Sequence, residues 1–327
     1  MMLAIDMLRE LTIASPKDAW TKVFDYAWSI CAEPLPEKNI ASEILRRDDA
    51  IAPVDLFLSS AAWNLWFDYY NSVTHTAEQL LQWWDSQLGG RAILILDGLS
   101  IREAPWIIEG AKTRGYAVSA GVTCSELPGD TNSFAKALTV SQRSSLENNK
   151  IPSTTRLKHA TSDTSASNWA DCLPLIGAQP NWIFWHHWPD NRIHELGTQS
   201  GKGLVDLTKE IMQQLTDDFF WQFVERLTTG RNLVITSDHG YAASGRFPDV
   251  SDPYQATYLK SSFGSQRHTN TNDTDIEIWM PPLDLTIGQH RLALGRRHWK
   301  SQGGYPNLAH GGLTVLECAS PFIELTR

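Results

Sequence analysis

The sequence has few cysteines, and their spacing excludes domains that are built on bridged or metal-bound thiols. The four cysteines of the 327-residue chain stand at positions 31, 124, 172 and 318, and no two form a C-x-x-C pair. This pattern provides neither a disulfide framework nor a zinc finger. We therefore expect reduced thiols in a cytoplasmic protein.

The chain also lacks an excess of positive charge and any long apolar run. Its formal net charge is −9, so a phosphate-bearing substrate must be met by a local basic patch or by metal ions. No apolar run approaches the roughly 20 residues of a membrane span. Asp6, Arg9 and Glu10 interrupt the first apolar stretch, which is atypical of a signal peptide. We expect a cytoplasmic protein without a membrane partner.

The chain begins with helical patterns and without strand alternation. A helix is expected from Pro16 to about Ala32, a second after Pro53, and a third that ends at Gly89-Gly90. We therefore predict a helical N-terminal subdomain over residues 1–88.

From Arg91 onward, short apolar segments alternate with amphipathic ones. They predict strands over 92–96, 116–123, 182–188 and 233–236, helices over 103–114, 131–142 and 203–228, and β-like stretches at 276–280 and within 284–299. The alternation indicates an α/β domain over residues 89–327, with a doubly wound, mostly parallel sheet flanked by helices. The polar residues 143–175 are predicted to form a long surface loop or insertion.

Acidic residues stand just past three of the expected strands. Asp97 follows the first, Asp190 follows the strand 182–188, and Asp238 follows the strand 233–236. Each has an ordinary alternative as a turn residue or a solvated carboxylate. Because ligands bind outside the carboxyl ends of strands in open α/β sheets, three such residues together indicate a shared site.

Histidines accompany these carboxylates. His194 stands four residues after Asp190, so both can lie on one face of a helical turn and hold the same cation. His239 follows Asp238 directly, and His310 stands in an H-G-G turn, where the alternative is a local hydrogen bond. Three aspartates and three histidines suit two borderline divalent ions, Zn²⁺ or Mn²⁺.

A pair of metal ions suggests phosphoryl chemistry, because it can clamp the attacking and leaving oxygens of a displacement. A hydroxyl nucleophile is then expected near another strand end. Thr131 and Ser133 stand where a helix is predicted to begin, and the alternative for Thr131 is a helix N-cap. The residues by themselves do not choose between the two hydroxyls.

The ordered series of these residues resembles the alkaline phosphatase superfamily of binuclear metal phosphotransferases. Four surrounding motifs are similar to its PglZ-domain branch, which occurs in bacterial anti-phage exclusion systems: L-D-G-L-S-I-R-E, L-P-G-D-T-N-S-F, I-T-S-D-H-G-Y and H-G-G-L-T-V-L-E-C-A-S-P. The match covers about residues 90–327, and the first ninety residues lie outside it. It implies an alkaline-phosphatase-like sheet.

The resemblance also implies roles for individual residues. One metal would lie among Asp97, Thr131, Asp238 and His239, and the other among Asp190, His194 and His310. Thr131 would be the nucleophile that forms a phosphothreonine intermediate, which water then hydrolyses.

Two arginines are candidates for binding the substrate. Arg102 is expected either to hold phosphate or to structure the site, and Arg297, in the run R-R-H-W-K, either to bind phosphate or to end a solvated strand. The sulfatase motif C-x-P-x-R is absent, since Cys124 begins C-S-E-L-P, and sulfate esters are therefore disfavoured.

The sequence thus predicts a metal-dependent phosphodiesterase or phosphatase that acts on a nucleotide or nucleic acid in phage defence. The alternative is a PglZ-like scaffold subunit that binds the protein partners of a defence complex with weak or no hydrolysis. Monoester and diester, the kind of nucleic acid or nucleotide, the metal and the oligomeric state stay open.

Overall fold

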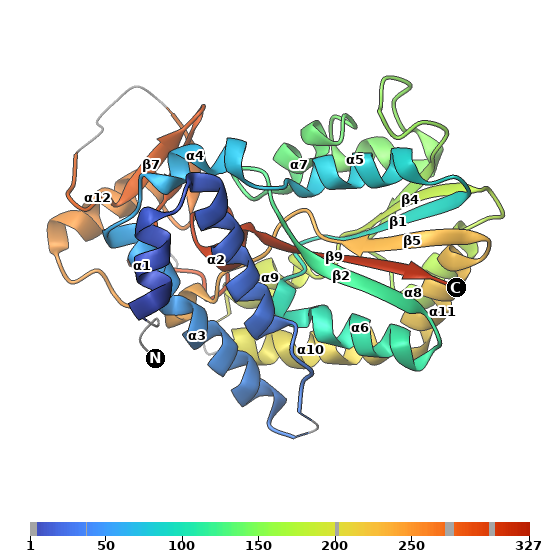
Figure 1. The fold of residues 1–327 in the computed structure, drawn as a ribbon, viewed down its shortest axis with the longest axis horizontal. Helices are drawn as coiled ribbons and strands as arrows, with labels where there is room; N and C mark the ends of the chain where they lie inside the picture. The colour runs from blue at the N-terminus through green and yellow to red at the C-terminus, as the bar shows by residue number, and fades with distance from the viewer. Residues whose placement is uncertain (1–4, 37, 200–202, 272–277, 301–304) are drawn as a thin grey trace.

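The computed structural model describes residues 5–36, 38–199, 203–271, 278–300 and 305–327, and its centre is a six-stranded sheet (Figure 1). The strand order is β2-β9-β5-β1-β4-β3. Neighbours in the run β5-β1-β4-β3 are parallel, and β9 runs antiparallel to both β2 and β5. The strands are β1 Gly90–Leu96, β2 Ala117–Cys124, β3 Thr161–Ser165, β4 Asn181–His186, β5 Arg231–Thr236 and β9 Ala319–Thr326.

Helices cover both faces of this sheet, as the continuous apolar sequence of β1 requires. Ile93 and Ile95 pack against α5 Thr76–Ser86 and α7 Thr131–Ala137 on one face. Ala92, Leu94 and Leu96 pack on the other face, which is covered by α6 Ala104–Thr113, α8 Trp169–Cys172, α10 Leu204–Thr216 and α11 Asp218–Thr228 (Figure 1). The predicted α/β fold with a mostly parallel, doubly wound sheet is confirmed.

The N-terminal region is helical, with α1 Ile5–Ile13, α2 Pro16–Cys31, α3 Ile40–Ser60 and α4 Leu65–Ser72. The helix expected after Pro53 is present as α4, but the proline itself lies inside a further helix, α3, which begins at Ile40 and continues through it. Proline removes one backbone hydrogen bond, and burial of Ile51, Val54 and Leu58 along the same helix offsets that loss. The domain boundary at residue 88 stays a prediction. Within the described residues, no helix is long and apolar enough to cross a membrane.

Three further predictions are corrected by local backbone geometry. The helix expected over 131–142 ends at Ala137, because Thr139 adopts a left-handed φ of 61°. The helix expected over 203–228 is divided at Asp217, whose extended ψ of 140° ends α10 and whose side chain caps α11. The segment 143–175 is not only a surface loop, because it supplies β3, a polar strand at the edge of the sheet.

A smaller lobe follows the main sheet strand β5. It contains α12 Pro253–Phe263 and a three-stranded sheet with the order β6-β8-β7, formed by β6 His268–Asn270, β7 Asp284–Ile287 and β8 His290–Ala293. The strands expected within 284–299 are confirmed by β7 and β8. Of the β-like stretch expected at 276–280, residues 276 and 277 lie outside the described residues, and residues 278–280 form no strand. The chain then passes through α13 Val315–Cys318 into β9.

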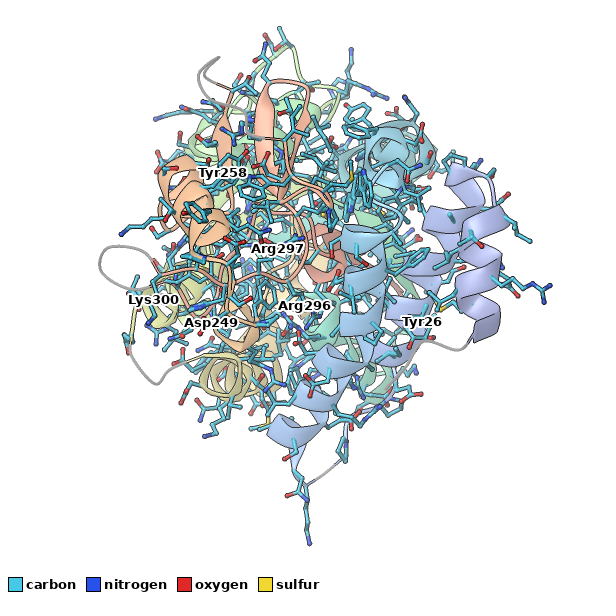
Figure 2. All side chains as sticks on the ribbon, turned by 90° about the vertical axis from the view of Figure 1, so that its left-hand side faces the viewer. Tyr26, Asp249, Tyr258, Arg296, Arg297 and Lys300 are labelled. Carbon is cyan, nitrogen blue, oxygen red and sulfur yellow. The ribbon has the colours of Figure 1, made fainter. Side chains whose placement is uncertain are left out.

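A buried ion network joins α3 to the loops that follow β1 and the small lobe. Asp48 of α3 is 1% exposed and accepts from Nη1 of Arg102 at 2.7 Å and from Nη1 of Arg296 at 2.8 Å. Asp55 lies two helical turns further along α3 and accepts from Nε of Arg296 at 2.7 Å. In the view of Figure 2, Arg296 lies between α3 and the lobe that carries α12.

We predict that Asp48→Ala destabilises the protein strongly. The substitution leaves two buried guanidinium groups without their shared carboxylate, and breaking such a buried pair costs about 3–5 kcal/mol. The free energy of unfolding in urea measures this. Asp49→Ala is the matched control, because Asp49 is 64% exposed in its ion pair with Arg246, and its loss should change stability by less than about 1 kcal/mol. Equal effects of the two substitutions would contradict the assigned role of Asp48.

Candidate metal centre

Three carboxylates lie together past the ends of the neighbouring strands β5, β1 and β4 of the main sheet. Asp97 follows β1 and Asp238 follows β5 at matching positions, since Ile95 of β1 pairs with Thr236 of β5. Asp190 begins α9 Asp190–Gly197, and its backbone N–H donates to the carbonyl of Asp97 at 2.9 Å. Asp97 and Asp238 are fully buried, and Asp190 is 8% exposed.

The turn after β1 brings two of these carboxylates together. Gly98 has a φ of 73°, which side-chain-bearing residues rarely adopt, and a Cβ at this position would meet the side chains of Ile193 and Asp190 at 3.1 and 3.3 Å. Its N–H donates to Oδ1 of Asp238 at 2.9 Å. The Asp97-Gly98 turn therefore holds the carboxylate of Asp238 close to Asp97.

The first group of candidate ligands contains Asp97, Asp238 and His239. Nε2 of His239 lies 3.7 Å from Oδ1 of Asp97 and 3.5 Å from Oδ2 of Asp238. The Thr131 hydroxyl lies 3.3 Å from Oδ1 of Asp97 and 3.2 Å from Oδ2 of Asp238. Thr131 is not the N-cap of α7, because Asp130 takes that position and accepts from the N–H of Ser133.

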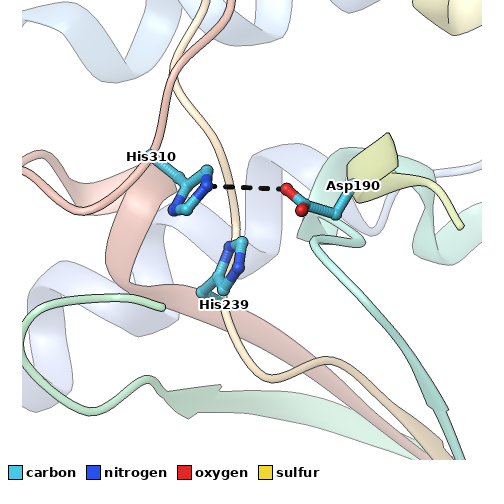
Figure 3. A group of neighbouring side chains, drawn as sticks. All are labelled: Asp190, His239 and His310. Atoms are coloured by element: carbon cyan, nitrogen blue, oxygen red, sulfur yellow. Dashed lines mark ion pairs between the residues drawn. The ribbon is translucent and has the colours of Figure 1, made fainter. Parts of the chain in front are cut away.

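A second group lies beside the first: Asp190, His239 and His310 offer ligand atoms within 4.8 Å of one another, so His239 is shared by both groups. His194 contacts Asp190 and His310 of this group. Nε2 of His194 lies 3.2 Å from Oδ2 of Asp190, which is the geometry expected of residues four apart on a helix. Nε2 of His310 lies 3.5 Å from Oδ1 of Asp190 and 3.3 Å from Nε2 of His194. The rings of His239 and His310 stack with centroids 4.2 Å apart, so the two groups adjoin (Figure 3).

Backbone carbonyls fix how two of the histidines present their nitrogens. Nδ1 of His239 lies 2.9 Å from the carbonyl of Gly240, and Nδ1 of His310 lies 2.9 Å from the carbonyl of Gly129. A carbonyl only accepts, so each Nδ1 carries a hydrogen and each neutral ring turns its Nε2 lone pair towards the carboxylates. This is the arrangement of histidine that binds a metal ion.

Two buried atoms at this place have no hydrogen-bond partner among the described residues: Nε2 of His239 and Oδ1 of Asp190. A lone pair opposed to carboxylate oxygens is repulsive unless a proton or a metal ion lies between them. The donor set of carboxylates and imidazoles is one that Zn²⁺ or Mn²⁺ accepts. The residues present therefore fit a metal centre.

Electrostatics acts differently on the members of the cluster. Burial opposes a charge on His239, but the charges of Asp238 and Asp190 outweigh it and raise the pKa of this imidazole. Burial, reinforced by the charges of Asp238 and Asp190, raises the pKa of Asp97 well above its usual range. Burial, with the neighbouring charge of His239, lowers the pKa of His310 to about 4, so its imidazole is neutral near pH 7 and free to act as a ligand. The hydrogen bond with Asp190 raises the pKa of His194.

A cavity of about 800 Å³ reaches part of the candidate centre, whereas the buried Asp97, Asp238 and His239 are not among its lining residues. Thr131, Asp190, His194 and His310 line one part of it. Residues 265–268 of the small lobe and residues 305–309 line the opposite part. A ligand that reaches the candidate metal centre is therefore in contact with both the main sheet and the lobe.

The structure places the two predicted substrate arginines away from this cavity. Arg102 is fully buried, with Nη1 on Asp48 and Nη2 donating to the carbonyl of Tyr241 at 2.8 Å. Arg297 donates to the carbonyls of Leu294 and Pro282. Neither is among the residues that line the cavity. For Arg102 this geometry agrees with the structural alternative, and a substrate-binding role for Arg297 stays a prediction.

Two residues at the site were missed from the sequence. Arg143 forms an ion pair with Asp97, and Nε2 of His268 lies 3.6 Å from Oδ2 of Asp130 at the cavity wall. Arg143 stands in the polar segment that was interpreted as a loop, and His268 stands in the small lobe. Neither carries a local motif, so only the folded chain identifies them.

Comparison with known proteins adds a likeness of fold. No protein-family model and no curated protein matches the chain. Among solved structures, murine ectonucleotide pyrophosphatase/phosphodiesterase 5 aligns over 72% of this chain and 87% of its own, at 11% identity and a TM-score of 0.42. Phosphonoacetate hydrolase from Sinorhizobium meliloti 1021, in complex with phosphonoformate, aligns over 72% of this chain and 89% of its own, at 13% identity and a TM-score of 0.39. At this level of similarity the site has to be judged by its own residues.

We predict that Asp97→Asn stabilises the metal-free protein. The amide keeps the shape of the side chain and removes one of three clustered negative charges, which should raise the free energy of unfolding by about 1–3 kcal/mol at pH 7. Urea unfolding in the presence of a chelator measures the change. The exposed Asp85 gives the control, because Asp85→Asn removes the same charge outside the cluster. A destabilised Asp97→Asn protein would contradict this prediction and show that the lost ion pair with Arg143 outweighs the relief of repulsion among the carboxylates.

Proposed function

We propose that this protein is a metal-dependent hydrolase of phosphoric esters with Thr131 as its nucleophile. One observation carries the proposal: the Thr131 hydroxyl lies within 3.4 Å of the Asp97 and Asp238 carboxylates, and Thr131 lines the same cavity as Asp190 and His310. A hydroxyl in this place has both an acceptor for its proton and room for a substrate.

Two divalent ions, Zn²⁺ or Mn²⁺, would be held by this chain. Asp97, Asp238 and His239 would hold the ion next to Thr131, and Asp190, His194 and His310 would hold the other. When bound, such ions neutralise the charge of a phosphoryl group and acidify hydroxyl groups and water near them. The contacts of Nε2 of His239 with Asp97 and Asp238 support its place beside Thr131, and the same imidazole also lies close to Asp190 and His310.

The residues of the chain would then carry out a two-step displacement. Thr131 Oγ forms a bond to phosphorus and passes its proton to a neighbouring carboxylate, while the ester oxygen leaves with the bonding electrons. Water subsequently hydrolyses the phosphothreonine and restores the hydroxyl. Of the two candidate hydroxyls, Thr131 is the one that contacts the carboxylates, and this supports it over Ser133.

The finer assignment rests on the sequence motifs. They favour a PglZ-domain protein that acts on a nucleotide or nucleic acid in phage defence. Residues 1–88 lie outside these motifs, and their assignment as a helical subdomain and the cytoplasmic location rest on composition and local patterns. The ligand geometry favours an active enzyme over a scaffold, since a scaffold has no need of six convergent metal ligands.

We predict that Thr131→Ala lowers kcat for phosphoester hydrolysis by about a thousandfold or more and leaves the metal content unchanged. Ser133→Ala is the matched control, two residues along the same helix, and should retain near-complete activity. Hydrolysis of mono- and diester substrates, together with elemental analysis of each variant, measures both effects. If Ser133→Ala is the inactive variant, the nucleophile has been assigned to the wrong hydroxyl.

We predict that Asp238→Asn abolishes metal-dependent hydrolysis and lowers the metal content of the purified protein. Asp238 lies against both Thr131 and His239, so its loss weakens the ion beside the nucleophile. Wild-type protein that holds no metal, cleaves neither class of ester and yet co-purifies with partner subunits would favour the scaffold function. Full activity of Asp238→Asn would exclude the proposed site.

A further inference from the structure

An arginine outside every sequence motif contacts one of the two groups of candidate ligands. Nη1 of Arg143, from the short helical segment η2 Arg143–Asn149, forms an ion pair with Oδ2 of Asp97. Asp97 is fully buried, whereas the Arg143 side chain is 24% exposed and reaches inward from the edge of the site. Among the described residues, it is the one lysine or arginine with an ion pair to Asp97, Asp190 or Asp238.

The backbone before Arg143 adopts conformations that side-chain-bearing residues rarely take. Thr139 and Ser141 have φ values of 61° and 69°. The N–H of Gln142 donates to the carbonyl of Val140 at 2.8 Å, which closes a tight turn around Ser141. The turn directs the chain back towards Asp97, so Arg143 follows it immediately.

Contacts with β3 also hold the segment after Arg143 in place. Leu146 is fully buried, and its carbonyl accepts from the hydroxyl of Ser162 on β3 at 2.9 Å. Oδ1 of Asn149 accepts from the N–H of Ser162 at 3.1 Å. Arg143 is therefore held between a tight turn and the edge strand of the sheet.

The two groups of ligands consequently differ in how their carboxylates are paired. In the Asp97 group Arg143 contacts one of two carboxylates, and Asp238 is the other. The Asp190 group has no arginine or lysine in ion-pair contact among the described residues, and Oδ1 of Asp190 lacks a hydrogen-bond partner there. A divalent ion that binds Asp97 therefore competes with a guanidinium for that carboxylate, whereas an ion that binds Asp190 meets no such competitor.

We propose that Arg143 sets the order in which the two metal ions bind, so that the Asp190 group is filled first and the Asp97 group second and more weakly. This inference rests on the proposed two-metal function. In the metal-free protein Arg143 neutralises part of the buried charge at Asp97, and when the second ion arrives the guanidinium opposes it. Arg143 thereby makes the ion beside Thr131 the one that dissociates more readily.

The test is a calorimetric titration of metal-free protein with Mn²⁺, with the bound ions counted by elemental analysis. Wild type should bind two ions with dissociation constants at least about tenfold apart. Arg143→Gln should tighten the weaker site by about tenfold and bring the two constants together. Arg143→Lys keeps the positive charge and should keep the separation. Arg156→Gln is the matched control, because the exposed Arg156 carries the same charge on the same polar segment, and it should leave both constants unchanged.

The possible results separate this inference from the proposed function. Two ions with equal affinity in the wild type, or two constants that Arg143→Gln does not change, would overturn the role of Arg143 and leave the hydrolase proposal in place. A weaker second site in Arg143→Gln would overturn it as well, since Arg143 would then support the ion. A wild-type protein that binds no Mn²⁺ at all would overturn both.

Discussion

Three buried carboxylates, those of Asp97, Asp190 and Asp238, are held close together in this molecule. The rest of the structure has to accommodate their charges. The parallel register of β5 and β1 sets Asp238 opposite Asp97, and the hydrogen bond from the N–H of Asp190 to the carbonyl of Asp97 adds the third. Negative charges gathered away from water raise the free energy of the fold unless positive charge lies among them. Arg143 supplies such a charge at Asp97, and the hydrogen bond with Asp190 raises the pKa of His194 on α9. His239 and His310 turn their Nε2 atoms towards the same carboxylates.

The site is held in shape by elements that do not touch it. Arg102 binds Asp48 of α3, and its other nitrogen donates to the carbonyl of Tyr241, two residues beyond His239. Because Arg102 itself stands five residues after Asp97, a single side chain ties together the loops that follow β1 and β5. The helical N-terminal region therefore contributes to the metal centre through this buried network, even though it supplies no candidate ligand.

The small lobe gives the site its other wall. Residues 265–268 precede and begin β6, and residues 305–309 lead to His310, so the cavity lies between the ligand groups and a part of the chain that is separate from the main sheet. The close approach of His268 to Gly311, where a Cβ would lie 2.2 Å from the imidazole, fits the lobe against the H-G-G turn. Substrate selection would then depend on the lobe, while the chemistry depends on the strand ends.

Local patterns in the chain predicted the strands β1, β4 and β5, the helical N-terminal region and the acidic and histidine residues past the strand ends, because burial periodicity and short-range spacing are local properties. The remaining features depend on the tertiary structure. It makes the polar segment Thr161–Ser165 an edge strand, because hydrogen bonds to β4 compensate for its weak alternation of apolar and polar residues. It also engages Arg102 and Arg297 in contacts with residues that do not line the cavity. It also brought Arg143 to Asp97, 46 residues earlier, through a turn whose left-handed residues are not glycines. Such a contact depends on long-range packing, which leaves no periodicity or spacing in the chain from which it could be predicted.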